Sequence, residues 1–440
     1  MARLAATRCM RIGEKGLSAV RLVDMILGVE PRVRRPSPGS PTSLKEANQA
    51  RLIEALQFAG TMTQAELSRF TGLAPSTVSN IVRELTTSGL LRVSPTVSHG
   101  RTAQAVRLSR GAGVLVAADF GHRHLTVAIA DLAYEILAEE RVTLEWDHRV
   151  DDGLAEVGRI AERLLAALGL ARELVVGVGM GLPAPIDSRT GQVGAPSQLP
   201  GWVGVDAAAL ATERLGVPVR VDNDANLGAL AEDRWGAGRG ADNVAYVKLS
   251  DGVGAGLVIR GELYQGSIGT AGEIGHATMN EFGALCRCGN RGCLETLVAT
   301  SVLLDQLAPN HGTSLTIADA VRMAHAGDVS CRRVLEDAGH HVGVAVANLC
   351  NIFNPDRIII GGELAQAEDL IVGSIRRALK RQGIPSAAEA VHIVMAELGA
   401  RSQVLGALVI ASSGASPEAL GSALRNTVET DQRLLRTVEH

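Results

Sequence analysis

Residues 272–295 read GEIGHATMNEFGALCRCGNRGCLE, and this stretch gathers four side chains that bind soft metal ions. They are His276, Cys286, Cys288 and Cys293. Three thiolates and one imidazole complete a tetrahedral zinc shell without a water ligand, which is typical of a structural zinc ion. Gly289 and Gly292 allow the tight turns that such close ligands need. The alternative, three buried free cysteines, is disfavoured by this spacing.

The rest of the composition fits a globular protein of more than one domain. The chain has 440 residues, too many for one ordinary core. No apolar run is long enough for a membrane helix, and no signal peptide is recognisable. Clustered cysteines without a secretion signal predict metal binding in the cytoplasm rather than disulfides. The other three cysteines, Cys9, Cys331 and Cys350, stand alone and are expected to be ordinary small side chains.

From Gly113 onward the chain alternates short apolar runs with helical stretches, the pattern of an α/β domain. VLVAADF, LTVAIAD and ILAEERVTL follow one another as in a strand meander, and further strands and helices continue to about residue 409. Residues 1–43 are expected to be a flexible extension, because their end is rich in Pro, Ser and Arg. Residues 412–440 are polar and are expected to be a loose tail.

Residues 44–110 predict a winged helix-turn-helix: three short helices followed by a hairpin. Thr63 and Glu66 form a capping box that starts the second helix. Pro75 suits the first turn of the third, whose apolar face is Val78, Val82 and Leu85. The hairpin is expected in LLRVSPTVSHGRTAQAVRLS, with the wing tip at residues 99–101.

Charge favours DNA as the partner of this unit. Residues 1–110 contain 16 basic and 7 acidic residues, whereas the remainder contains 27 and 40. A basic segment attached to an acidic body is typical of contact with a polyanion. The side chains expected to reach bases and phosphates are Ser76, Thr77, Ser79, Asn80, Arg83 and Arg101. A basic disordered arm, or a winged helix used for protein contact, remains the alternative.

The motif of residues 272–295 resembles the signature of the ROK family of repressors and sugar kinases. The similarity covers about residues 112–410 and matches every fixed position of the cysteine motif. It implies an α/β, two-lobed, actin-like ATPase fold over residues 111–411, C-terminal to the winged helix. Lobe one would comprise residues 111–235 and 398–411, and lobe two residues 236–397. A helix over residues 401–411 would return to the first lobe.

The resemblance also implies a sugar site between the lobes. The matching positions are Asn223, Asp224, Glu273, His276 and Glu295. Asp224 matches the kinase base, and His276 would bind zinc through one ring nitrogen and sugar through the other. Residues 181–185 resemble a turn that lines the sugar cleft. Trp202 is either a lid residue or a core tryptophan.

The ATP half departs from the family pattern. Where kinases have Asp-x-Gly-Gly-Thr, this chain has His122 and Arg123 in place of the second Gly and the Thr. Where they have Gly-Thr-Gly-x-Gly, it has Asp251 in place of the Thr, so a carboxylate would repel phosphate. Gly361 and Gly362 resemble the adenosine-side turn. A binder with Asp224 as a vestigial base is therefore expected, with no catalytic residue.

These observations predict a sugar-responsive transcriptional repressor of carbohydrate-utilisation genes. Its expected partners are double-stranded operator DNA and a sugar effector of unspecified identity, and it is expected to be a cytoplasmic homodimer or homotetramer. One alternative is a ROK sugar kinase with an appended DNA-binding domain. The other is an activator with the same domains.

Overall fold

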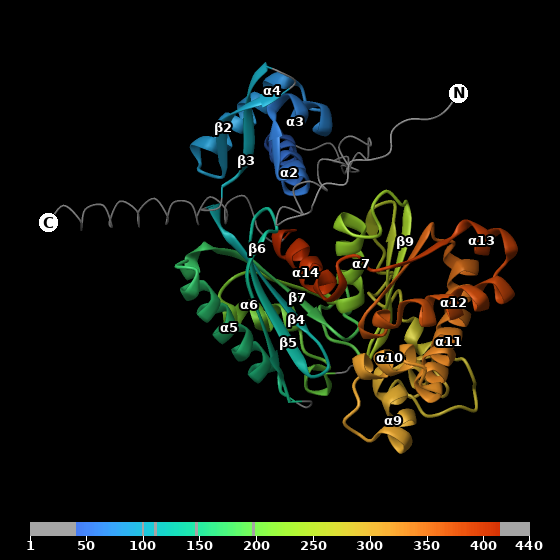
Figure 1. Cartoon of the computed structure of the whole chain (residues 1–440). Coiled ribbons are helices and arrows are strands. Elements are labelled where there is room, and N and C mark those ends of the chain that lie inside the picture. The colour runs from blue at the N-terminus through green and yellow to red at the C-terminus, as the bar shows by residue number, and fades with distance from the viewer. Residues whose placement is uncertain (1–40, 99–100, 110–111, 146–147, 196–198, 414–440) are drawn as a thin grey trace, which may run out of the picture. The chain divides into compact units, whose positions relative to one another are not determined.

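The computed structural model describes residues 41–98, 101–109, 112–145, 148–195 and 199–413 (Figure 1). The chain forms two compact units, Met1–Ala112 and Gly113–His440, which are described separately here. The expected flexible extension and loose tail lie almost wholly outside the described residues. In the part that is described, no helix has the length and apolar character needed to cross a membrane.

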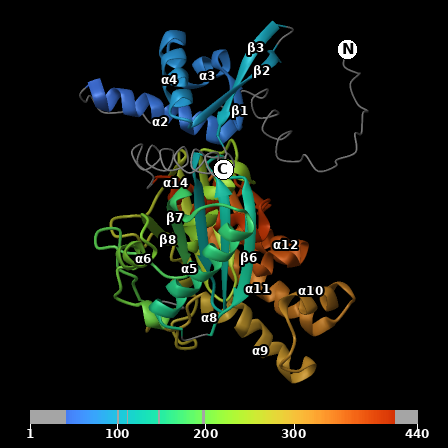
Figure 2. The same cartoon turned by 90° about the vertical axis from the view of Figure 1, so that its left-hand side faces the viewer.

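The first unit is the predicted winged helix (Figure 2). Its elements are α2 (Pro41–Ala59), β1 (Thr61–Thr63), α3 (Gln64–Thr71), α4 (Pro75–Thr87), β2 (Leu91–Ser98) and β3 (Arg101–Leu108). The capping box is confirmed, because Thr63 Oγ1 accepts from Glu66 N at 3.3 Å and Glu66 Oε2 accepts from Thr63 N at 2.7 Å. Two details differ from expectation: α2 begins at Pro41, and β1 adds a third strand beside β3.

The first lobe of the second unit is a five-stranded sheet with strand order β6-β5-β4-β7-β8. The strands are β4 (Val114–Phe120), β5 (His124–Asp131), β6 (Ile136–Thr143), β7 (Val175–Leu182) and β8 (Val219–Asn223). The first three form the predicted antiparallel meander, whereas β4, β7 and β8 are parallel. Helices α5 (Val150–Ala167) and α6 (Ala207–Leu215) lie on its outer face (Figure 1).

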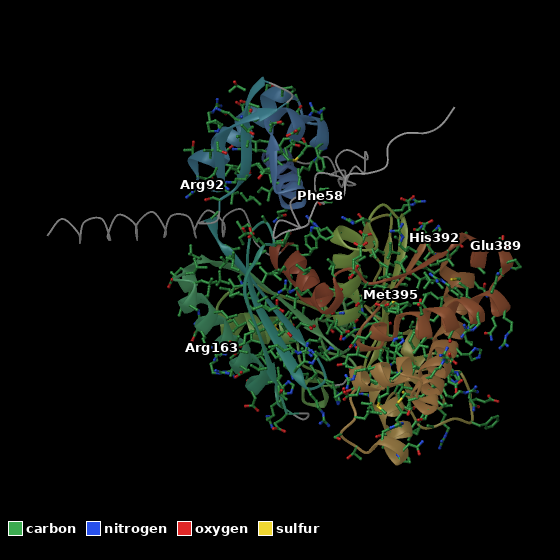
Figure 3. The ribbon with its side chains drawn as sticks, in the orientation of Figure 1. Phe58, Arg92, Arg163, Glu389, His392 and Met395 are labelled. Atoms are coloured by element: carbon green, nitrogen blue, oxygen red, sulfur yellow. The ribbon has the colours of Figure 1, made fainter. Side chains whose placement is uncertain are left out.

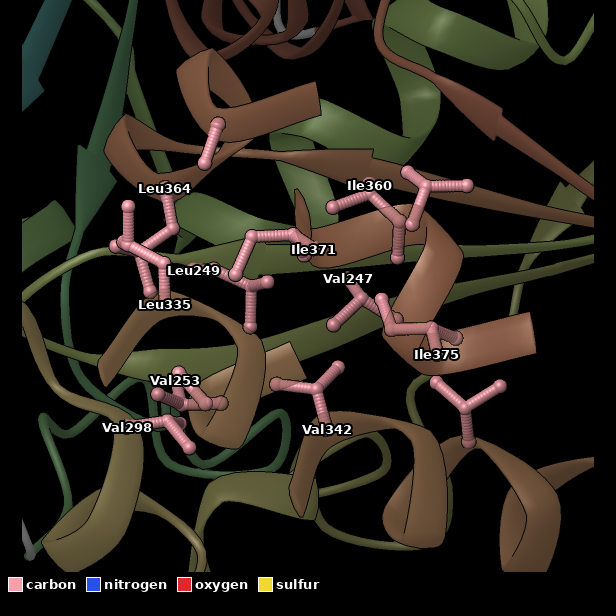
Figure 4. Close-up of a cluster of buried hydrophobic side chains, with 14 of the residues drawn as sticks. Val247, Leu249, Val253, Val298, Leu335, Val342, Ile360, Leu364, Ile371 and Ile375 are labelled. Carbon is pink, nitrogen blue, oxygen red and sulfur yellow. The ribbon is translucent and has the colours of Figure 1, made fainter. Parts of the chain in front are cut away.

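The second lobe repeats this topology, with strand order β11-β10-β9-β12-β13. Its strands are β9 (Asn243–Leu249), β10 (Val253–Ile259), β11 (Glu262–Leu263), β12 (Arg357–Gly361) and β13 (His392–Met395). The first and last residues of β13, His392 and Met395, are labelled in Figure 3. Its longer helices are α9 (Thr300–His311), α10 (Ile317–His325), α11 (Val329–Phe353) and α12 (Glu368–Gln382), and its short ones α8 (Glu295–Val298) and α13 (Pro385–Ala390). Aliphatic side chains fill the space between sheet and helices, Val247 and Ile360 against Val342 and Ile371 (Figure 4).

Two helices lie between the sheets. The predicted return helix is α14 (Ser402–Ser413), which packs on β4 and β7, while α7 (Asp224–Trp235) packs on β9 and β10 and against α14 (Figure 1). Glycines permit this close approach. A Cβ on Gly179 would lie 1.9 Å from the carbonyl oxygen of Ala407, and one on Gly406 would lie 2.0 Å from that of Leu227.

Gly179→Ala therefore tests this packing. The added methyl meets backbone rather than a movable side chain, so we expect a loss of about 3 kcal/mol in the free energy of unfolding. Gly158→Ala is the matched control. Gly158 lies inside α5 and an added Cβ would be 3.5 Å from Leu215, so this change should stabilise by up to about 1 kcal/mol. Thermal unfolding should therefore give a lower melting temperature for Gly179→Ala than for Gly158→Ala. Equal melting temperatures of the two variants would contradict this account of the packing.

Candidate functional site

The sugar-site residues predicted from the sequence line one cleft in the second unit. Its volume is about 420 Å³, part of it open to solvent. Asn223 ends β8, Lys248 is close to the end of β9, and Pro183 follows β7, so the cleft lies at the carboxyl ends of parallel strands. This is the usual ligand position in open α/β sheets. The structure brings together all five predicted residues: Asn223, Asp224, Glu273, His276 and Glu295.

The turn from β8 into α7 is fixed by side-chain hydrogen bonds. Asn223 caps α7, because its Oδ1 accepts from Ala225 N at 2.8 Å and from Asn226 N at 3.4 Å. Asp222 is buried, and its two carboxylate oxygens accept from Asn226 Nδ2 and from Gln265 Nε2, each at 2.8 Å. These bonds fix the backbone at the point where Asp224 enters the cleft.

Asp224 does not stand alone in the cleft, because its carboxylate pairs with the ammonium of Lys248. The side chains are 8% and 17% exposed, so water screens this ion pair poorly. Burial alone would lower the pKa of Lys248, but the charges of Asp224 and Asp119 raise it above its usual value. Among the described residues, Asp119 Oδ1 is buried without a hydrogen-bond partner, and burial raises the pKa of Asp119 to about 6.

The opposite wall of the cleft carries Glu273, His276 and Glu295. Glu295 Oε1 forms an ion pair with Arg287, 3.0 Å from its Nε, and Glu295 Oε2 accepts a hydrogen bond from Val253 N at 3.1 Å. Glu273 Oε2 lies 3.9 Å from His276 Nε2. Burial, together with the charges of Asp224 and Glu295, raises the pKa of Glu273 to about 7. The wall therefore offers carboxylate oxygens and a ring nitrogen, which suit sugar hydroxyls.

Behind this wall the four predicted metal ligands converge. His276 Nδ1 lies 3.5 Å from Cys286 Sγ, and Cys288 Sγ lies 3.6 Å from Cys293 Sγ, too far for a disulfide. The four ligand atoms all lie within 4.8 Å of one another. Gly289 and Gly292 have φ values of 90° and 59°, so the tight turns predicted there are present. This donor set fits a tetrahedral metal ion, with His276 Nε2 left on the cleft side.

The two segments that resemble the kinase phosphate loops in sequence make contacts within the protein. His122 Nε2 lies 3.7 Å from Asp251 Oδ2. Asp251 Oδ1 accepts from Thr300 Oγ1 at 2.7 Å and from Ser301 N at 3.0 Å. Trp202 is fully buried against Phe120, so it is a core residue, and the lid interpretation is wrong.

In the winged helix, α4 buries Val78, Val82 and Leu85 as predicted, together with Ile81. The predicted DNA-contacting side chains of α4 lie on its other face. Ser76, Ser79, Asn80 and Arg83 are exposed, and Thr77 is half-buried. Arg83 Nη2 donates to Asn80 Oδ1 at 2.8 Å. Arg101 begins β3, but its side chain and residues 99–100 lie outside the described parts.

Sequence reasoning missed several residues of these two sites. Lys248 and Arg287 enter the cleft as cations, and Gln265 reaches Asp222 from 43 residues away. In the winged helix, Arg92 of β2, labelled in Figure 3, is paired with Arg107 of β3. Both side chains are exposed. Arg287 lies inside the quoted cysteine motif and could have been noticed there; the others depend on contacts that only the fold creates.

Comparison with protein families matches residues 115–413 to the ROK family and residues 44–102 to the MarR family. Similar proteins include the xylose repressor of Bacillus spizizenii, 27% identical, covering 83% of this chain and 94% of the relative. The DNA-binding transcriptional repressor Mlc of Escherichia coli is also 27% identical, covering 86% and 96%.

Solved structures give the same assignment. A ROK family transcriptional regulator described as a homologue of E. coli Mlc superposes with a TM-score of 0.70 at 28% identity, covering 87% of this chain and 98% of that one. A ROK family glucokinase from Streptomyces griseus, in complex with glucose and AMPPNP, gives 0.60 at 26% identity, covering 69% and 100%.

A metal ion held by this cluster would stabilise the second unit, so its loss should destabilise the unit. Cys288→Ala removes one of four ligands, so we expect a loss of at least about 3 kcal/mol and a fall in melting temperature on the order of 10 °C. Cys350→Ala is the control, because it removes a thiol of the same size, buried in α11 and outside the cluster. Calorimetry with metal analysis measures both. Equal melting temperatures of the wild type before and after proven metal removal would contradict the expectation.

Proposed function

The chain belongs to the ROK family, and from that premise we propose that it is a sugar-responsive DNA-binding transcriptional repressor. One observation carries the proposal: a single chain joins a winged helix to a domain whose cleft contains Asp224, at the position that resembles the kinase base, paired with Lys248. The relatives named repressors extend over both units, whereas the glucokinase covers only 69% of this chain. Carbohydrate-utilisation genes are the proposed targets.

We propose that the cleft binds sugar without phosphorylating it. A general base needs a free carboxylate that can take a proton from the reacting hydroxyl. The carboxylate of Asp224 is instead paired with the ammonium of Lys248, so it is not free to take that proton. His122 and Asp251 fill the positions that resemble the phosphate loops. Asp224 would then serve as a hydrogen-bond acceptor for sugar, beside Asn223, Glu273, His276 and Glu295.

The proposed metal is a structural zinc ion held by His276, Cys286, Cys288 and Cys293. Three sulfur ligands favour zinc over magnesium or calcium, and protein atoms fill all four positions. With Nδ1 on the metal, His276 would present Nε2 to the cleft. The ion would thereby orient a sugar ligand without taking part in chemistry.

For DNA, the proposed contacts are Ser76, Thr77, Ser79, Asn80, Arg83 and Arg101. Helix α4 offers short polar side chains opposite its buried face, as a recognition helix in the major groove requires. A homodimer or homotetramer would present two such helices to a two-fold operator in the cytoplasm. Sugar binding would release DNA if it favours an arrangement with the wrong half-site spacing.

Substitution of Arg83 tests the DNA contacts. Arg83→Ala and Arg101→Ala should each weaken binding to a duplex selected by the wild type from a random pool, and lower the salt slope by about 1 per lost phosphate contact. Arg333→Ala is the matched control, because Arg333 is exposed and pairs with a side chain of its own helix, as Arg83 does. An unchanged affinity and slope for both test variants would overturn the assignment.

Glu273→Gln tests the sugar site. We expect a hexose or pentose from a panel to raise the wild-type melting temperature, and the variant to bind it about tenfold more weakly, because an amide replaces a two-acceptor carboxylate. Asp337→Asn, at an exposed position in α11, should bind like the wild type.

The same sugar decides between binder and kinase. With ATP and this sugar, a coupled assay should detect no sugar-dependent ADP. Steady ADP production would overturn the proposal of a non-catalytic cleft and favour a kinase with an appended DNA-binding domain.

A further inference from the structure

A second group of metal-binding side chains lies in lobe two, outside the sugar cleft and its cysteine cluster. His311 is the last residue of α9, Asp328 caps α11, and Cys331 lies in the first turn of α11. His311 Nε2 lies 3.5 Å from Asp328 Oδ1 and 3.7 Å from Cys331 Sγ. One ligand atom from each of the three residues lies within 4.8 Å of the other two.

These separations match the dimensions of a metal site. Zinc bonds of about 2.0–2.3 Å at tetrahedral angles place neighbouring ligand atoms roughly 3.3–3.8 Å apart. The cysteine cluster shows the same spacing, at 3.5 and 3.6 Å. An imidazole, a carboxylate and a thiol are also the three side-chain types that zinc uses most.

A simple helix cap accounts for only part of this arrangement. Asp328 Oδ1 accepts from Cys331 N at 2.9 Å and from Ser330 Oγ at 2.8 Å, which satisfies the start of α11. The cap requires neither an imidazole from another helix nor a thiol beneath it. His311 Nε2 also contacts Ser330 Oγ at 2.9 Å, a hydroxyl that can rotate away when an ion takes its place.

We propose that His311, Asp328 and Cys331 bind a second zinc ion, separate from the one at the cysteine cluster. Cys331 is fully buried, whereas the side chains of His311 and Asp328 are 12% and 27% exposed. The fourth coordination position therefore faces solvent and takes water. The ion would join the end of α9 to the start of α11 and close the connection that contains α10. One thiolate in place of three makes this the weaker of the two sites.

Counting zinc in the full-length protein tests the proposal. After loading with excess ZnCl₂ and gel filtration, the wild type should carry about two ions per chain and Cys331→Ala about one. Cys350→Ala, at the other end of the same helix, should keep about two. Cys331→Ala adds a good helix former at a buried helical position, so folding is expected and circular dichroism checks it.

Cobalt supplies a second readout that separates the two sites. Co²⁺ bound at the second site should give a thiolate charge-transfer band that Cys331→Ala and His311→Ala lose. Both variants should keep the band of the cysteine cluster. About one zinc ion per chain in the saturated wild type, or equal zinc content in the wild type and folded Cys331→Ala, would overturn the proposal.

Discussion

The close packing of α14 and α7 between two sheets is the constraint on which the second unit depends. Each helix covers the inner face of one sheet, and the two lobes meet through the contact of α14 with α7. Gly179 and Gly406 bring backbone against backbone at distances that any side chain would prevent. Because α7 is held in this way, its first turn carries Asn223 and Asp224 to the carboxyl ends of the strands. The position of the proposed sugar site is thus a consequence of helix packing.

The chemistry of that site then follows from one buried ion pair. Lys248 lies on β9 of lobe two, whereas Asp224 begins α7 and Asp119 lies on β4 of lobe one. The carboxylates of Asp119 and Asp224 would repel each other in a poorly hydrated site, and the ammonium of Lys248 offsets that repulsion. In the non-catalytic cleft proposed above, the same pairing leaves no free base for phosphoryl transfer. Stability of the cleft and the proposed loss of catalysis would then have the same physical origin.

Local rules explain why some features were predictable. The capping box at Thr63 and Glu66, and the turns at Gly289 and Gly292, depend on residues a few positions apart, so the sequence displays them directly. Alternating apolar runs likewise predicted the strand meander of lobe one. The pairs Lys248–Asp224 and Gln265–Asp222 join residues 24 and 43 positions apart, and no local pattern indicates them. Cys331 stands alone in the sequence for the same reason, whereas the fold places its Sγ 3.7 Å from His311 Nε2.

Sugar binding in such a cleft has an energetic requirement that its geometry can meet. Asn223 ends a strand of the lobe-one sheet and Asp224 follows it, whereas Glu273, His276 and Glu295 belong to lobe two. A sugar that contacts residues of both lobes binds more tightly to the conformation in which the lobes are close enough for all of these contacts. Only this difference in affinity between conformations shifts the equilibrium between them. To shift the ratio of two conformations from 1:99 to 99:1, the sugar must bind the favoured conformation about 10⁴-fold more tightly than the other. This ratio of affinities corresponds to about 5.5 kcal/mol. A few hydrogen bonds made in one arrangement alone, at about 1 to 3 kcal/mol each, supply that amount.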